Sequence, residues 1–336
     1  NRIEAEPLVF NADQGSFVNR ASFVTDEDID YRNAKQNNTR YQLTSFGKLK
    51  YRVNQDINIT LGGSYRRFNG EIWSLNNTLF APDANGRNIS DNYRVYLRFS
   101  QIFTPDDPGD KVIKNVSYQL QADYARTKVT TNDIEFGDDV FKYGHVGRFT
   151  PDRAEAFELI SPGDGRHDPS ISSAPYFQTS GYRDTALYFD ASNSSNPVLA
   201  NYNEVIYDYL DRNPRPNPFS LNDQFDPPYS TNVFSELDLV TLGGVRNGDT
   251  PQNQYSLFSM PGQRTGSYSE QINEIYRISG FSTLYLGRRS SKKSEDDSND
   301  GGTHELRFGF EFDQRVERFY NLFARGLWQR MRQLSN

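Results

Sequence analysis

Residues 41–67 read YQLTSFGKLKYRVNQDINITLGGSYRR, and this stretch decides the fold class. Its odd-numbered positions are mostly apolar or aromatic, from Tyr41 to Val53 and again from Ile57 to Tyr65. The positions between them are mostly polar or basic. An alternation of period two places the apolar side chains on one face of a β-strand. Two such runs joined by a short polar turn predict a β-hairpin.

The same alternation returns further along the chain. Six strands are therefore expected, near residues 41–53, 57–67, 93–103, 116–124, 276–286 and 306–312. Over these runs one face is apolar or aromatic at 27 of 34 positions and the other at 5 of 28, a contrast too wide for chance. Most runs have about 9–13 residues, as tilted membrane-crossing strands do, whereas soluble strands cluster near 5–6.

The composition points the same way. Only 35% of the residues are hydrophobic and the mean hydropathy is −0.79, which is too little apolar material for an ordinary core. The aromatic share of 14% argues against disorder. A membrane barrel resolves the conflict, because its apolar side chains face lipid and its interior is polar. The run ends carry two levels of aromatic residues, as membrane interfaces require, with Tyr41, Tyr65, Tyr93 and Tyr124 at one level and Tyr51 and Phe103 at the other.

The connections between the runs alternate in length. Short turns at 54–56 and 104–115 alternate with longer loops at 68–92 and 125–275. Outer-membrane barrels have short periplasmic turns and long extracellular loops, and only the polar segment 287–305, which has the composition of a flexible insertion, departs from this rule. The loop 125–275 is too long to be structureless, and it is expected to be folded.

One helix is expected within this long loop. Asn196 is a suitable N-cap and Pro197 a suitable first helical residue, and apolar residues recur at helical spacing as far as Leu210. The apolar stripe is interpreted mainly as the packing face of a folded loop domain, with a partner-helix site as the alternative.

Several functional classes are excluded. With 37 basic and 44 acidic side chains, the chain lacks the electrostatic signature of a nucleic-acid-binding protein. It has no cysteine and no apolar stretch long enough for a transmembrane helix. The three histidines are scattered and no nucleophile motif is present, so neither enzymatic activity, nor a metal site, nor a cofactor is expected.

The polar face of the expected strands is mainly basic. Its candidate lumen-facing or substrate-binding residues are Arg52, Arg66, Arg94, Arg98, Arg277 and Glu311. In a polar channel such residues would favour anionic substrates or anchor a plug by salt bridges. The alternative interpretation is ordinary lumen polarity, with ionic partners elsewhere in the barrel.

Three segments carry a resemblance to a known family. They are residues 57–64 (INITLGGS), 114–124 (KNVSYQLQADY) and 304–315 (HELRFGFEFDQR), and residues 326–328 (GLW) add to them. The chain resembles part of the barrel of a TonB-dependent outer-membrane receptor of the type abundant in Bacteroidota, which are Gram-negative bacteria. The resemblance implies a 22-stranded barrel filled by an N-terminal plug, with uptake energised by the inner-membrane TonB complex. A surface lipoprotein is a further partner that it suggests.

The chain begins at Asn1 without a methionine or a signal peptide, so we expect it to be a piece of a longer protein. Residues 1–336 are interpreted as a single partial β-barrel domain, an integral part of the outer membrane in contact with its lipid. The expected function is active uptake of a nutrient such as a glycan, a peptide or a metal chelate. Two alternatives remain, namely a soluble or surface β-rich adhesion protein, and an outer-membrane barrel that acts as a passive pore or secretion platform.

Overall fold

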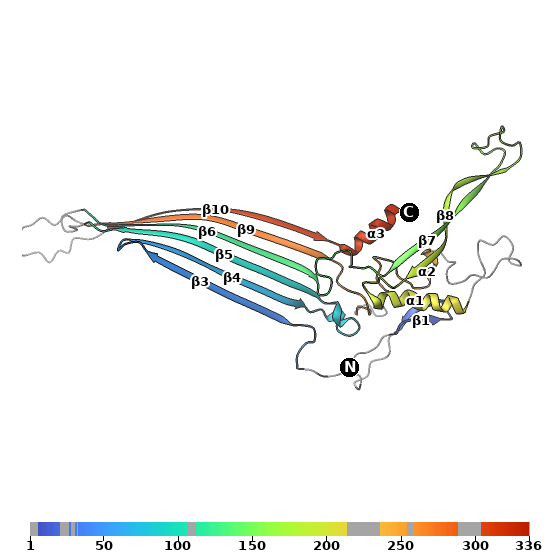
Figure 1. Cartoon of the computed structure of the whole chain (residues 1–336), viewed down its shortest axis with the longest axis horizontal. Helices are drawn as coiled ribbons and strands as arrows, with labels where there is room; N and C mark the ends of the chain where they lie inside the picture. The colour runs from blue at the N-terminus through green and yellow to red at the C-terminus, as the bar shows by residue number, and fades with distance from the viewer. Residues whose placement is uncertain are drawn as a thin grey trace, which may run out of the picture.

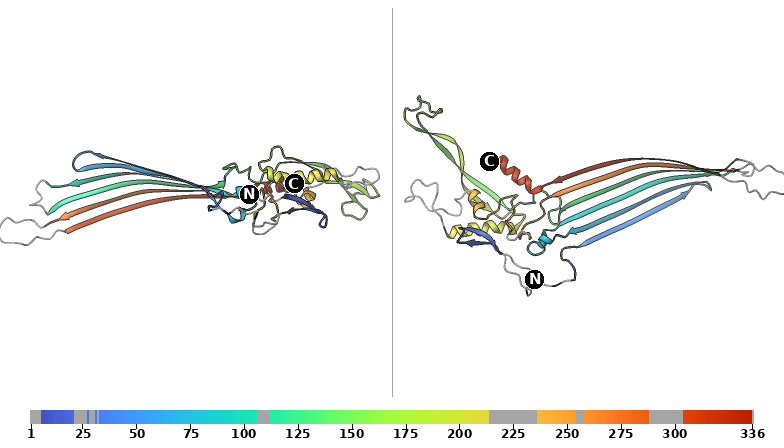
Figure 2. Two further views of the ribbon diagram at one scale, coloured as in Figure 1. Left: turned by 90° about the horizontal axis from the view of Figure 1, so that it is seen from below. Right: turned by 180° about the vertical axis from the view of Figure 1, so that it is seen from behind.

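The computed structural model describes residues 6–20, 27, 31, 33–105, 112–213, 236–253, 258–287 and 304–335. In this part of the chain the protein is mostly antiparallel β-sheet with few helices, which confirms the all-β class. A long six-stranded sheet extends from a folded region at one of its ends (Figure 1). We call this region the cap, and it comprises residues 6–20, the described residues between 134 and 267, and residues 324–335. Views from below and behind show the cap at this end of the sheet alone (Figure 2).

The sheet contains strands β3 (Arg40–Arg52), β4 (Ile57–Ile72), β5 (Gly86–Phe103), β6 (Ile113–Asp133), β9 (Tyr268–Leu286) and β10 (His304–Leu322). Their spatial order is β10-β9-β6-β5-β4-β3, and all neighbours are antiparallel. Because β6 pairs with β9, the long segment between them, residues 134–267, leaves and re-enters the sheet at the same end (Figure 1). Within the described residues the sheet is open, with β3 and β10 at its edges.

All six expected strands are present, but most are longer than the alternation suggested. The strand expected at 306–312 runs from His304 to Leu322. The loop expected at 68–92 comprises only residues 73–85. It contains two short 3₁₀ turns, η2 (Leu75–Asn77) and η3 (Pro82–Ala84). The long excursion likewise spans 134–267 and not 125–275. Near the cap both faces of the strands carry polar residues, so the alternation disappears while the hydrogen-bonded ladder continues. Most of the expected insertion at 287–305 lies outside the described residues.

The pairing register aligns the apolar side chains across the whole sheet. One continuous row consists of Leu49, Leu61, Leu97, Ala122, Ile278 and Phe312. Several of these side chains are largely exposed, since Leu97 is 51% exposed and Ile278 is 54% exposed. The sheet therefore presents a wide apolar face that nothing in the described residues buries.

The apolar face ends at tyrosines towards the cap. The Tyr65 hydroxyl donates to Asp91 Oδ1 at 2.7 Å, and the Tyr124 hydroxyl donates to Glu274 Oε1 at 3.0 Å. Arg126 Nη1 in turn donates to the Tyr93 hydroxyl at 3.1 Å. Aromatic rings thus lie on the apolar side of this border and charges on the other.

Charged pairs continue beyond this tyrosine border on the same face. Lys128 Nζ lies 2.8 Å from Glu270 Oε2, and Arg318 Nη1 lies 2.6 Å from Glu274 Oε2. The expected position of Tyr41 in the border was wrong, because the register places Ser45 opposite Tyr65 and carries Tyr41 further toward the cap.

The cap contains the conventional hydrophobic core of the described residues. Its elements are the hairpin β1 (Glu6–Asn11) and β2 (Ser16–Arg20), the hairpin β7 (Arg148–Ile160) and β8 (Tyr176–Asp190), and helices α1 (Pro197–Arg212), α2 (Glu236–Thr241) and α3 (Ala324–Ser335). The buried cluster consists of Leu8, Phe17, Val146, Leu187, Leu199, Tyr202, Ile206, Leu210, Leu239, Leu242 and Val245. None of the helices in the described residues combines the length and apolarity needed to cross a membrane.

Helix α1 confirms the helix expected from the sequence. The Asn196 side chain accepts a hydrogen bond from the Leu199 amide at 3.1 Å, and Pro197 occupies the first turn. The apolar stripe of α1 lies in the cap core, as Leu199, Ile206 and Leu210 show. The stripe is therefore the packing face of a folded loop domain, which is the main interpretation from the sequence, and not a partner-helix site.

A buried ion pair joins the two points where the cap leaves and re-enters the sheet. Arg264 Nη2 lies 2.9 Å from Asp133 Oδ1, and its Nε lies 3.2 Å from Asp133 Oδ2. The Asp133 side chain is fully buried, and its Oδ1 also accepts from the Glu135 and Phe136 amides. Burial by itself lowers the pKa of Arg264, but the hydrogen bonds to Asp133 outweigh burial and raise that pKa.

We expect Arg264→Met to destabilise the cap by about 3–5 kcal/mol, because it leaves the Asp133 carboxylate buried without its cation. The measurement is denaturant-induced unfolding of the cap, monitored by the susceptibility of the cap to proteolysis. The double variant Arg264→Met with Asp133→Asn should recover part of the loss. Equal stability of wild type and single variant would contradict the assignment of this pair.

Candidate functional site

The polar face of the sheet brings together four of the six residues expected to be functional. In the ladder, Asp123 is opposite Tyr96 on one side and Arg277 on the other. Arg94 Nε donates to Asp123 Oδ1 at 3.1 Å, and Arg98 Nε donates to Gln121 Oε1 at 2.7 Å. A second ion pair joins Arg277 Nε and Glu311 Oε1 at 3.3 Å. The ladder pairing of Asp123 with Arg277 brings these two groups of contacts side by side as one polar cluster on β5, β6, β9 and β10.

Arg66 and Arg52 lie apart from this polar cluster. Arg66 Nη2 donates to Gln42 Oε1 at 3.0 Å, near the β3 edge. Arg52 is the last residue of β3, opposite Asn58, and is exposed.

Asp123 organises the polar cluster, although it was not among the expected site residues. Its side chain is only 5% exposed, and it accepts from both Arg94 and Gln121, whose Nε2 lies 2.8 Å from Asp123 Oδ2. The sequence signal was available, because Asp123 is an acid on a face that is otherwise mostly basic. Arg94 and Arg277 both have carboxylate partners, so the cluster resembles a side-chain network that stiffens the polar face of the sheet. It resembles an open anion-binding site less.

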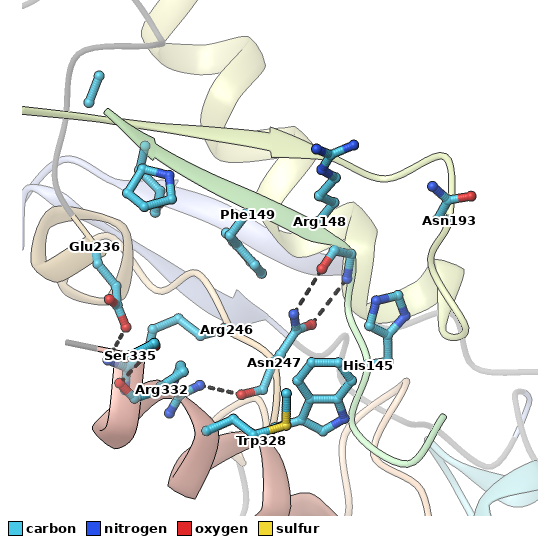
Figure 3. Close-up of a pocket in the computed structure, with 15 residues that line it drawn as sticks. His145, Arg148, Phe149, Asn193, Glu236, Arg246, Asn247, Trp328, Arg332 and Ser335 are labelled. Carbon is cyan, nitrogen blue, oxygen red and sulfur yellow. Dashed lines mark hydrogen bonds and ion pairs between the residues drawn. The ribbon is translucent and has the colours of Figure 1, made fainter. Parts of the chain in front are cut away.

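The cap holds a second candidate site, a cavity of about 560 Å³ between β7, the segment 246–247 and helix α3. Phe149, Trp328 and Met331 contribute apolar surface, and Glu236 and Arg246 contribute charge (Figure 3). A cavity of this size with mostly apolar walls and a few polar groups fits a small organic ligand or a side chain of a partner.

Asn247 fixes one wall of this cavity (Figure 3). Its Oδ1 accepts from the Val146 amide at 2.6 Å and the Gly147 amide at 3.2 Å, and its Nδ2 donates to the Gly147 carbonyl at 2.8 Å. One side chain thus satisfies three main-chain groups about 100 residues away in the sequence.

A chain of ion pairs fixes the other wall. Arg246 contacts Glu236 Oε1 at 2.8 Å and Asp249 Oδ2 at 2.7 Å, and Arg332 contacts Asp249 Oδ1 at 2.9 Å. The pKa of Arg246 is lowered by burial but raised overall by its hydrogen bonds to Asp249 and Glu236. These pairs tie α2, the segment 246–249 and α3 together, so they form the frame of the cavity.

His145 and Trp328 meet at the edge of the cavity, with ring centroids 5.3 Å apart. His145 Nδ1 accepts from the Ser195 amide at 3.4 Å, and Trp328 Nε1 donates to the Phe141 carbonyl at 3.0 Å. Burial lowers the pKa of His145 below its ordinary value of 6.5. The neutral imidazole is therefore the form that the fold accommodates.

The sequence did not indicate this cavity. Its residues come from β7, β8, α2, α3 and the loop segments 145–147 and 246–247, together with Asn193, and they meet only after the chain has folded. His145 is one of the three scattered histidines, and the side-chain clamp formed by Asn247 has no sequence motif. In the described residues, no group of three or more His, Asp or Glu side chains is placed to hold a metal ion.

No protein-family model matches this chain, and no curated protein is significantly similar to it.

We expect Asn247→Ala to destabilise the cap by about 2–3 kcal/mol, because it leaves the Val146 and Gly147 amides without their acceptor. The measurement is the unfolding midpoint followed by Trp fluorescence. Asn193→Ala is the matched control, since Asn193 lines the same cavity but is exposed, and its midpoint should not move. Equal effects of the two substitutions would contradict the clamp.

The depressed pKa of His145 predicts a pH dependence. Below pH 6.5, His145 is protonated in the unfolded chain, whereas in the folded cap it stays neutral until the pH reaches its lowered pKa. The free energy of unfolding therefore decreases as the pH falls from 6.5 to that lowered pKa. His145→Gln should remove this part of the pH dependence, with unfolding midpoints measured from pH 7.5 to pH 5. An unchanged slope in the variant would show that His145 does not cause it.

Proposed function

We propose that this chain is part of a transmembrane β-barrel of the bacterial outer membrane, and that the barrel is a TonB-dependent receptor for nutrient uptake. The observation that carries the membrane part is the exposed apolar face of the six-stranded sheet, with its row from Leu49 to Phe312. Soluble proteins rarely leave contiguous apolar patches larger than roughly 300–600 Å² exposed. Lipid chains cover such a face without needing hydrogen bonds.

The dimensions of the apolar face support a bilayer as its surroundings. On β5 the face extends from Tyr93 to Phe103. At roughly 3.4 Å per residue and a strand tilt of about 40°, this span rises about 26 Å, close to the roughly 25 Å apolar band of outer-membrane barrels. The tyrosines at its cap side fit an interface, where the ring lies in the apolar layer and the hydroxyl meets polar groups.

The cap would then lie outside the cell. The cap contains the longest connection, residues 134–267 between β6 and β9, whereas the opposite end of the sheet has the short turn between β3 and β4. Outer-membrane barrels place their long loops on the extracellular side. The polar cluster around Asp123 would face the lumen.

Closure of the barrel needs strands beyond these six. Both edges of the described sheet expose unpaired main-chain groups along β3 and β10, and a membrane span must satisfy those groups by pairing. We propose that further strands of the same protein continue the sheet from both edges. The number of 22 strands, the plug and the TonB partner rest on the sequence resemblance alone, as does a surface lipoprotein partner.

The first test fractionates cells that express the full-length protein. We expect an outer-membrane species that migrates differently on unboiled and boiled gels, as folded barrels do. A folded, monodisperse protein without detergent would support the soluble adhesin and contradict the barrel.

A second measurement separates the receptor from a passive pore. The purified protein in planar bilayers should conduct little current if a plug fills the lumen. Large, steady conductance would instead support the pore or secretion platform.

We expect Ile278→Arg to block assembly of the barrel, because an arginine at the bilayer midplane costs about 2–4 kcal/mol. Ser279→Arg is the matched control, because Ser279 is the next residue and faces the polar side near Glu311. The measurement is the folded fraction in outer membranes by heat modifiability. Equal assembly of both variants would contradict lipid contact at Ile278.

A further inference from the structure

The cap cavity of about 560 Å³ has walls that are mostly apolar. Its apolar lining side chains are Phe149, Pro151, Ala186, Leu187, Trp328 and Met331. They come from β7, β8 and α3, so the cavity lies where three elements of the cap meet (Figure 3). Small-molecule sites have volumes of about 300–1,000 Å³, so this cavity is large enough for a ligand that contains a ring.

The two aromatic rings that line the cavity are held in place by the protein. Trp328 Nε1 donates to the Phe141 carbonyl at 3.0 Å, and the Trp328 ring packs against the His145 ring with centroids 5.3 Å apart. The Phe149 ring packs against the Phe189 ring with centroids 5.0 Å apart. A ligand therefore meets rings whose positions are set before it binds, which reduces the entropy cost of binding.

The two arginines that line the cavity are bonded to protein groups. Arg246 lies 2.8 Å from Glu236 Oε1 and 2.7 Å from Asp249 Oδ2. Arg332 Nη2 lies 2.9 Å from Asp249 Oδ1, and its Nη1 donates to the Asn247 carbonyl. Hydrogen bonds to a guanidinium lie in its plane, so what these arginines offer a ligand is mainly the flat face of each group.

Three kinds of lining group favour an aromatic ring over an aliphatic one. The rings of Phe149 and Trp328 attract a further aromatic ring more strongly than its buried area alone accounts for. The Met331 thioether makes favourable contacts with aromatic rings. The guanidinium groups of Arg246 and Arg332 are attracted to the face of an aromatic ring. An aliphatic ring of the same size would lose each of these contacts.

We propose that this cavity binds an aromatic ring, with Phe149, Trp328 and Met331 as the residues that recognise it. Asn193, which is exposed and lines the same cavity, offers hydrogen bonds to a polar substituent of the ring. Two sources have this chemistry, a free aromatic compound and the aromatic side chain of a peptide. The inference rests on the cap alone and does not require the membrane location.

The test is isothermal titration calorimetry on the purified full-length protein at pH 7. The free-compound probes are phenol and cyclohexanol, and the peptide probes are N-acetylphenylalaninamide and N-acetylcyclohexylalaninamide. Within each pair only the aromaticity of the ring differs. We expect at least one aromatic probe to bind about threefold to tenfold more tightly than its saturated counterpart, the factor that an aromatic contact supplies. Binding of one aromatic probe alone assigns its source, and binding of both supports recognition of the ring itself.

Two variants assign the binding to this cavity. Met331→Trp should abolish binding of the aromatic probes, because the larger side chain fills the cavity from a position on α3 that is 46% exposed. Phe149→Leu should lower the preference for an aromatic probe over its saturated counterpart about threefold, because it keeps an apolar wall but removes one ring.

Phe177→Leu is the matched control for Phe149→Leu. Phe177 belongs to the same hairpin, is 70% exposed and lies outside the cavity lining, so the affinities for both probes of a pair should not change. All variants are titrated in the same solution, so that uptake of a probe by detergent cancels in the comparison.

Three results would overturn the proposal. One is that neither phenol nor N-acetylphenylalaninamide binds, and another is that the saturated probes bind as tightly as the aromatic ones. The third is binding of an aromatic probe that Met331→Trp retains in full, which would place the ring elsewhere. If Phe149→Leu fails to fold, the comparison of Met331→Trp with the wild type decides the outcome.

Discussion

An antiparallel ladder of main-chain hydrogen bonds joins β10, β9, β6, β5, β4 and β3, and it fixes which side chains share a face. A shift of one residue would exchange the faces of a strand, so this register is what keeps Leu61, Leu97 and Ile278 in one row. The same register gathers Arg94, Asp123 and Arg277 on the opposite face. The separation of an apolar from a polar face, and with it the proposed membrane location, depends on this ladder.

The cap follows a different logic from the sheet. It buries an ordinary apolar cluster around α1, and single polar side chains hold distant segments together within it. Asn203 illustrates this, because its side chain donates to the Val245 carbonyl at 2.8 Å and accepts from the Val245 amide at 2.9 Å. Asn247 and the pair of Asp133 with Arg264 act in the same way. A chain with 30 asparagines thus uses several of them as long-range main-chain clamps.

The sequence predicted those parts of the fold that depend on local pattern. Period-two alternation located the six strands, and the helix N-cap residue Asn196 located α1. The hairpin β7–β8 was missed because two irregularities interrupt its pairing, one between Asp152 and Arg153 and one between Ala156 and Phe157. The cap-side ends of the long strands were missed for another reason. There Arg67, Asp91 and Lys128 occupy the face that is apolar elsewhere, and polar residues on both faces leave no alternation to detect.

The candidate site was predictable only as a face. The phase of the alternation placed Arg94, Arg98, Arg277 and Glu311 on one side, but their pairing depends on which residues the register brings opposite each other. The cap cavity lined by Phe149 and Trp328 was beyond reach, because its walls come from segments separated by more than 100 residues.

Nitroxide labels at neighbouring positions give the most direct measurement of whether the apolar face contacts lipid. The 336-residue chain has no cysteine, so Ile278→Cys and Ser279→Cys provide single labelling sites within it. In outer membranes, the label at position 278 should collide with oxygen, which concentrates in lipid, and be protected from a water-soluble nickel complex. The label at position 279 should show the reverse. Equal access of the nickel complex to both labels would contradict the account.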